Sequence, residues 1–169
     1  MKVAVVYYTR TGNTGLLVEC VASALREAGV QVSVLRIRPL KEYSPPLHLN
    51  PRLVFDTLVK GGTEIRLEPG EFEPAEYGAV VVASPIWISR LAPPAQQFLR
   101  KYAGRLGKYV LVVTSELGVN CGKVASVVER VARARPAVCF SVRGREIRSA
   151  SELGKIVRVI AGAVSKLAQ

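Results

Sequence analysis

The sequence has 169 residues, of which 49% are hydrophobic, and a formal net charge of +11. This length suits one domain spanning residues 1–169, and the composition argues against long disordered stretches. No stretch approaches the roughly 18 consecutive apolar residues of a membrane helix. The apolar run at 3–8 is too short for a signal peptide and predicts a buried strand, so we expect a cytoplasmic protein without a membrane span.

The cysteines and the histidine show no metal-ligand spacing. Cys20, Cys121 and Cys139 are far apart in the sequence, and His48 is the only histidine. A zinc site needs more ligands close together, and three cysteines do not suggest a disulfide framework. We therefore expect neither a metal site nor a disulfide.

Basic residues outnumber acidic ones, with 24 Lys and Arg against 13 Asp and Glu. Such a balance favours acidic partners, anionic ligands or nucleic acid, while a merely solvated basic surface is the alternative. The chain carries no nucleic-acid-binding motif, so a nucleic-acid partner is not expected.

Short apolar runs alternate with amphipathic stretches along the chain. Strands are predicted at 3–8, 30–37, 79–83, 109–114 and 137–142, and helices at 14–27, 94–102, 122–134 and 151–168, the last capped by Ser149 or Ser151. This alternation predicts an α/β fold, a doubly wound five-stranded parallel sheet in the order 2-1-3-4-5 with helices on both faces. The first and third strands are then neighbours, and their outgoing loops diverge to form a crevice.

The connection at 38–78 is too long for a plain crossover and contains six prolines. A short helix is predicted at 52–60, ended by Gly61 and Gly62. We expect the rest to be irregular and to lie on the surface. Since a structureless loop of this length is uncommon inside a compact domain, some of it must pack.

The loop after the first strand opens a helix and is rich in hydrogen-bond donors. Free backbone N–H groups at a helix N-terminus attract an anion, and a glycine permits a tight turn. The loop lacks the Gly-Lys-Ser/Thr ending of a Walker loop and the dinucleotide Gly-x-Gly-x-x-Gly pattern. An ordinary Thr helix cap is the alternative interpretation. The candidate phosphate-binding residues are Thr9, Arg10, Thr11, Gly12, Asn13 and Thr14.

The segment from Val5 to Thr14 resembles the phosphate-binding signature of the flavodoxin family. Tyr7 supplies the aromatic residue, and Thr9, Gly12 and Thr14 follow in register. Val18 stands where the family usually has alanine, which affects helix packing more than phosphate binding. The resemblance covers residues 1–38 and 78–169 and implies a flavodoxin-like fold that holds flavin mononucleotide (FMN) through three loops.

The second loop follows the third predicted strand and contains Trp87, the only tryptophan. A Ser-Pro-x-Trp segment after an apolar strand is similar to the loop that carries the flavin ring in this family. Trp87 would stack on the ring; filling a hydrophobic gap beneath the long connection is the alternative. The candidate residues are Ser84, Pro85, Ile86, Trp87 and Ile88.

The third loop follows the fourth predicted strand, and the resemblance places it beside the pyrimidine side of the ring. Backbone donors and Asn120 would then serve the ring carbonyls. Cys121 would lie near a helix N-terminus, where the pKa of a thiol falls, unless it is simply a small residue that fits. The candidate residues are Ser115, Glu116, Leu117, Gly118, Asn120 and Cys121.

Two departures from the family bear on function. Electron carriers of this family usually sandwich the ring between two aromatic residues, whereas the third loop offers only Leu117 and Val119. Carriers also commonly have a glycine near the tryptophan, whose peptide flips to hydrogen-bond the reduced ring. Ile88 follows Trp87 here, and a β-branched residue resists positive φ. We therefore expect weak stabilisation of the one-electron-reduced flavin.

Arginines are predicted at the loops of the carboxyl edge: Arg10, Arg90, Arg143, Arg145 and Arg148. If they ring the crevice, they raise the flavin potential and attract the phosphates of a nicotinamide cofactor; scattered, solvated arginines are the alternative. No side chain stands out as a catalytic acid or base.

Three functions remain open. The sequence favours an FMN-binding oxidoreductase, an NAD(P)H-dependent FMN reductase-type enzyme acting on a quinone or similar acceptor. The alternative is a flavodoxin-type electron carrier that serves an acidic redox protein. A flavodoxin fold that binds another phosphate or a protein is the third. The long connection and the apolar helices leave room for a homodimer.

Overall fold

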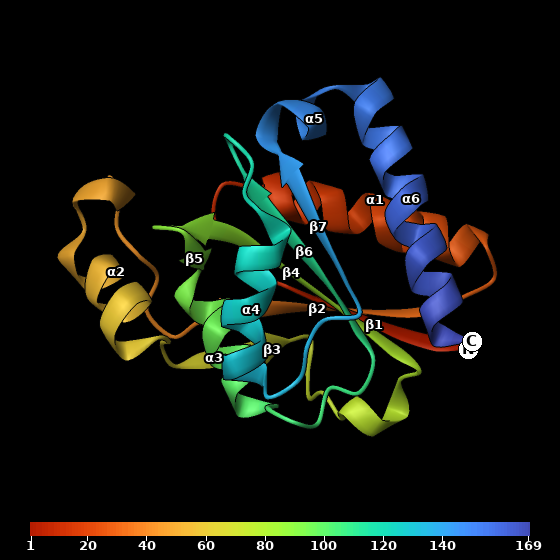
Figure 1. Cartoon of the computed structure of the whole chain (residues 1–169), viewed down its shortest axis with the longest axis horizontal. Helices are drawn as coiled ribbons and strands as arrows, with labels where there is room; N and C mark the ends of the chain where they lie inside the picture. Colours follow the sequence, from red (N-terminus) through yellow and green to blue (C-terminus); the bar gives the residue numbers. More distant parts are fainter.

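The computed structural model describes all residues, 1–169, as a central sheet covered by helices on both faces (Figure 1). Five strands run parallel in the order β2-β1-β4-β6-β7. This is the predicted 2-1-3-4-5 order. Their bounds are β1 Lys2–Tyr7, β2 Gln31–Pro39, β4 Ala79–Trp87, β6 Tyr109–Ser115 and β7 Val138–Arg143.

The sheet has seven strands rather than the five predicted. β3 (Ile65–Glu68) adds to the outer edge of β2 in antiparallel orientation. β5 (Arg90–Leu91) folds back on the end of β4, which runs four residues further than predicted. Both extra strands are too short to give a clear alternation of apolar and polar residues, so the sequence pattern does not reveal them.

The helices form two layers. α1 (Asn13–Glu27) and α6 (Ala150–Ala168) cover one face, and α3 (Pro93–Lys101) and α4 (Cys121–Ala132) cover the other. β1 supplies both cores by alternation, because Val3 and Val5 pack with the first pair while Ala4 and Val6 pack with the second.

One short helix was not expected. α5 (Gly144–Arg148) follows β7 directly and buries Ile147 in the core beneath α1 and α6. Ser149 then occupies the N-cap position of α6, as one of the two predicted caps, although its side chain makes no capping hydrogen bond.

The long connection is more ordered than predicted. It contains η1 (Leu47–Leu49), α2 (Pro51–Phe55), η2 (Asp56–Lys60), β3 and η3 (Pro74–Glu76). α2 and η2 form one continuous helical segment, as predicted for 52–60, which changes from α to π geometry at Asp56 and ends at Gly61 with φ 66°. The segment is attached to α3, because the Gln96 amide donates to the carbonyl of Thr57.

The two chain ends lie next to one another at the amino edge of the sheet (Figure 1). The Gly78 N–H donates to the Lys2 carbonyl at 3.0 Å, and the same glycine lies against the backbone of Ala168. The carboxyl ends of the strands, where the three predicted loops begin, are at the opposite edge. No helix combines the length and the apolar character required to cross a membrane.

Candidate functional site

A cleft of about 230 Å³ lies where β1, β4 and β6 end. All three predicted loops contribute to it, so the topology brings together segments that are about 100 residues apart in the sequence. Two lining residues, Thr114 and Gly144, were not among the predicted site residues. The lining residues are Arg10, Thr11, Asn13, Thr14, Pro85, Ile86, Trp87, Thr114, Ser115, Glu116 and Gly144.

The first loop presents the N-terminus of α1 to the cleft. Gly12 occupies the N-cap position with φ 104°, a left-handed conformation that favours glycine. Its N–H donates to the Thr9 hydroxyl at 3.1 Å, which fixes the turn. No side chain caps the helix and its first turn contains no acidic residue, so the N–H groups that follow Gly12 remain available to an anion.

Thr14 connects this helix to the end of β6. Its hydroxyl lies 2.7 Å from the hydroxyl of Thr114, and both side chains are buried. Two hydroxyls that share one hydrogen bond leave one proton free to donate elsewhere. Thr114, the last residue of the predicted fourth strand, was read only as a strand residue because its pairing with Thr14 is a tertiary contact.

Arg10 reaches across to the long connection. Its guanidinium donates to the carbonyl of Tyr43 at 3.3 Å and lies 3.8 Å from the Glu42 carboxylate. It is the buried Nε of Arg10 that faces Glu42, at a distance too long for a hydrogen bond.

Trp87 fills the gap beneath the long connection, the alternative considered for it, and its side chain also borders the cleft. Half-buried, it lines the cleft and also packs edge-on against Tyr8 and Tyr43, with ring centroids 5.6 and 5.7 Å away. Tyr43 belongs to the long connection and donates its hydroxyl to the buried Asp56 at 2.7 Å. Burial and this carboxylate raise the pKa of Tyr43 above its ordinary value, so the donor stays protonated. The connection thereby holds the indole in place.

The expectation that Ile88 resists positive φ is wrong. Ile88 and Ser89 adopt φ values of 51° and 61° in the two-residue turn between β4 and β5. Consecutive left-handed residues are the requirement of a type I′ hairpin, and pairing of Trp87 with Arg90 imposes it despite the β-branched side chain. The backbone argument for weak stabilisation of the one-electron-reduced flavin therefore no longer holds.

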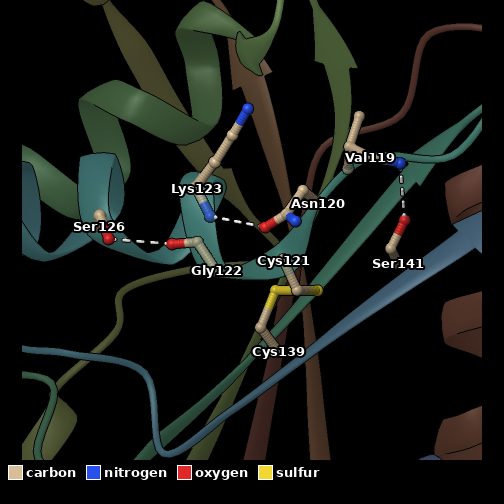
Figure 2. Close-up of a disulfide and its surroundings, with 8 residues drawn as sticks. All are labelled: Val119, Asn120, Cys121, Gly122, Lys123, Ser126, Cys139 and Ser141. Atoms are coloured by element: carbon tan, nitrogen blue, oxygen red, sulfur yellow. Dashed lines mark hydrogen bonds between the residues drawn. A yellow bond between two sulfur atoms is a disulfide. The ribbon is translucent and has the colours of Figure 1, made fainter.

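Hydrogen bonds within the third loop, to β7 and to α4 hold this loop in place. Ser115 accepts from the Gly118 N–H, and Ser141 of β7 accepts from the Val119 N–H at 3.1 Å. The side-chain oxygen of Asn120 caps α4 by accepting from the Lys123 N–H, so that oxygen is occupied (Figure 2). Leu117 is 93% exposed, and the loop contains no aromatic side chain.

The expectation for Cys121 and the absence of disulfides is corrected by the structure. Cys121 forms a disulfide with Cys139 of β7 and is therefore no free thiol (Figure 2). The bond joins the start of α4 to the edge strand of the sheet, with Cys20 left free. Sequence spacing cannot reveal this pair, because the two residues meet only when α4 packs beside β7.

Several predicted residues support the cleft without lining it. Thr9 fixes the turn at Gly12, and Ser84 accepts from the Ala92 N–H at 3.2 Å behind the second loop. The cleft lining does not include Thr9, Gly12, Ser84, Ile88, Leu117, Gly118, Asn120 or Cys121.

The arginines at the carboxyl edge are largely neutralised. Arg148 makes a two-pronged ion pair with Glu116 at 3.1–3.2 Å, which lowers the pKa of that carboxyl. Arg143 lies 3.7 Å from Glu146, and Arg10 lies beside Glu42. Of the five edge arginines only Arg10 lines the cleft, so they form no basic ring around it; Arg90 and Arg145 are the two without an ion pair. Gly144 lies against the Glu116 carboxylate, and a side chain at position 144 would collide with it.

Several solved structures are similar to this chain in fold. An FMN-complexed flavoprotein from Lactobacillus acidophilus superposes with a TM-score of 0.70 over 91% of this chain and 97% of its own, at 18% identity. A flavodoxin from the domain Archaea gives a TM-score of 0.59 at 14% identity, with both chains fully covered. The Streptococcus pneumoniae TIGR4 flavodoxin gives 0.56 at 14% identity over 98% of this chain and 99% of its own.

This is the flavodoxin fold. The strand order and the cleft at the carboxyl ends of β1 and β4 agree with the resemblance found in the sequence. No family model and no curated protein sequence matches the chain. At identities this low, the flavodoxin fold is established by the course of the backbone.

Proposed function

We propose that the chain is a redox protein that binds FMN in the cleft between the three loops. The observation that carries the proposal is one cleft lined by both an uncapped helix N-terminus and a half-buried tryptophan. The first suits a phosphate and the second suits an aromatic ring. The Lactobacillus acidophilus neighbour, whose structure contains FMN, supports the choice of ligand.

The residues present fit the two ends of this ligand. Backbone N–H groups after Gly12, with Thr11 and Asn13 beside them, would hold the phosphate. The Thr14–Thr114 pair has one hydroxyl proton left to donate to the ligand. Trp87 would lie against the ring. FMN itself would supply the hydride or electron chemistry, and the protein would supply binding and orientation.

An NAD(P)H-dependent FMN reductase is the first of two finer candidates. Its support is the absence of a second aromatic side chain: Leu117 is exposed and Val119 is tied to Ser141, so the third loop leaves that side of the cleft uncovered. A nicotinamide ring or a quinone would enter from there. Arg145, exposed and outside any ion pair, would attract a dinucleotide phosphate.

A flavodoxin-type electron carrier is the second candidate, and the charge distribution favours it. The edge arginines are mostly paired, so they provide little attraction for a small anionic substrate. Cations without partners lie instead on an outer surface beside Trp87. Such a surface suits a protein partner of opposite charge.

FMN retention by matched glycine variants tests the proposal. Gly12 and Gly29 both have positive φ and empty space where a Cβ would lie, but only Gly12 belongs to one of the three loops at the cleft. We expect wild type and Gly29→Ala to retain visible flavin absorbance after gel filtration and to show quenched Trp87 fluorescence. Gly12→Ala should lose both. No retained flavin in wild type, or equal retention by both variants, would refute the site.

Steady-state oxidation of NAD(P)H then separates the two finer candidates. The FMN-loaded protein is mixed with NADPH or NADH and a quinone, without any other protein. A reductase turns over under these conditions, whereas a carrier shows almost no oxidation without its partner.

A further inference from the structure

One side of the molecule carries cations that have no acidic partner. We call it the basic face and define it by Lys60 of η2, Arg90 of β5, Arg100 of α3, Arg130 of α4 and Arg133, the residue that follows α4. None of these five belongs to any of the ten ion pairs in the structure. Other unpaired cations, such as Arg26 and Arg158, lie on α1 and α6 at the opposite face of the sheet.

Contacts show that part of the basic face is continuous. Arg100, Arg130 and Arg133 line one shallow hollow between α3 and α4. The guanidinium of Arg100 also donates to the carbonyl of Lys60 at 3.0 Å, which ties η2 to the same surface.

Arg90 extends the face to the cleft. It lines a narrow groove with Leu99, Val127 and Val131, and Val131 also lines the arginine hollow. Arg90 pairs with Trp87 across the β4–β5 hairpin. Leu99 is buried, but Val127 and Val131 are half-buried and form a small apolar strip between the arginines, and the face reaches the hairpin that carries the cleft tryptophan.

No acidic side chain offsets this charge. β5 and α3 contain no Asp or Glu. The single acidic residue of α4, Glu129, lies 3.5 Å from Arg135, and that of η2, Asp56, is buried beside Arg52 at 3.4 Å. The basic face thus presents charge of one sign to any approaching molecule.

We propose that the basic face is the docking surface for an acidic protein. An apolar strip enclosed by charged residues is how protein interfaces are built, and four of the five cations are arginine, which interfaces favour over lysine. A second copy of this chain does not fit, because a symmetric contact would place like charges opposite each other. A phosphate backbone does not require the valine-lined groove.

The basic face lies next to the cleft, so docking there has a consequence for the cleft. A protein bound there would contact the hairpin of Trp87 and so approach whatever redox group the cleft holds. That consequence rests on the proposed function, whereas the docking itself does not.

The test is binding of an acidic [2Fe–2S] ferredoxin to the full chain, measured by calorimetry and by ¹⁵N NMR at low salt, with and without FMN. The face variant is Arg90→Glu/Arg100→Glu/Arg130→Glu. The control is Arg26→Glu/Arg158→Glu/Lys166→Glu, an equal charge change at exposed, unpaired positions of α1 and α6. We expect the face variant to bind about tenfold more weakly and the control to bind within about twofold of wild type. Shift changes should lie in β5, α3 and α4.

Three results would overturn the proposal: no binding by wild type at low salt, equal weakening in both variants, or shift changes on α1 and α6. A single-stranded oligonucleotide and anionic lipid vesicles are tested in parallel. The face would be assigned to one of these ligands instead if that ligand bound more tightly than ferredoxin and only the face variant lost its binding, while ferredoxin binding stayed unaffected. FMN retention is measured separately, so failure of the cleft proposal remains distinguishable from failure of the docking.

Discussion

The hydroxyl of Thr14 lies 2.7 Å from the hydroxyl of Thr114, and this contact joins the first turn of α1 to the carboxyl end of β6. Both side chains are buried and both line the cleft. Neither residue has an alternative partner among the side-chain hydrogen bonds of the structure. The pair therefore links two elements and also leaves one hydroxyl donor at the candidate site.

Removing one hydroxyl of this pair should cost more than removing both. Thr114→Val leaves the Thr14 hydroxyl buried without its partner, and we expect the free energy of unfolding to fall by about 1–2 kcal/mol. Thr14→Val/Thr114→Val should recover much of this loss, because no polar group is then left unpaired. Urea unfolding of wild type, Thr14→Val, Thr114→Val and the double variant measures the effect, and a double variant less stable than both single variants would contradict it.

The turn at Ile88 and Ser89 predicts a stabilising substitution. Ser89 has φ 61°, which costs a residue with a Cβ roughly 1 kcal/mol. Ser89→Gly removes that strain, and we expect the free energy of unfolding to rise by about 0.5–1 kcal/mol. The matched control is Ser23→Gly in the middle of α1, where the same change should destabilise the protein. Thermal and urea unfolding should give opposite signs for the two variants.

The disulfide should contribute to stability by restricting the unfolded chain. Cys121 and Cys139 are 18 residues apart, and closing a loop of this size is worth about 3 kcal/mol. We expect Cys121→Ser/Cys139→Ser, or treatment with a dithiol, to lower the free energy of unfolding by up to that amount. Cys20→Ser, which leaves the disulfide intact, serves as the control. If reduction left the urea midpoint unchanged, the bond would have no such role.

The Glu116–Arg148 pair predicts a pH dependence at the mouth of the cleft. Arg148 holds the pKa of Glu116 below its ordinary value of 4.5. Because the folded-state pKa is the lower one, the contribution of the pair is present above 4.5 and is lost as the pH falls through the folded-state pKa. We expect Arg148→Gln to return the pKa towards its ordinary value, as measured by carbon-13 NMR of the carboxyl group. Arg38→Gln should move Glu68 instead and leave Glu116 unchanged.

The parallel core and the first loop were predictable because their signals are local. β1, β4 and β6 contain continuous apolar runs and β2 alternates, and Gly12 with its neighbouring threonines marks the helix N-terminus within a few residues. β3 and β5 were missed because each is defined by pairing with a distant or folded-back strand and not by its own composition. Their short sequences carry no period that would separate them from a loop.

The remaining site errors have the same origin. The left-handed conformation of Ile88 opposes its local preference and is imposed by the strand pairing of Trp87 with Arg90. The bond between Cys121 and Cys139 follows from where α4 begins in space. Ion pairing of Arg148 with Glu116 across 32 residues likewise cancels a charge that the sequence alone counts as free.

The adjacency of the two chain ends has a practical meaning for anyone handling the protein. Both ends emerge at the amino edge of the sheet, away from the strand ends that border the cleft. A purification tag, a fluorescent domain or a chip surface attached through either end leaves the cleft open to solvent. A short peptide joining the ends would permit circular permutants, and a new opening in an exposed loop such as 104–108 would leave all three cleft loops intact.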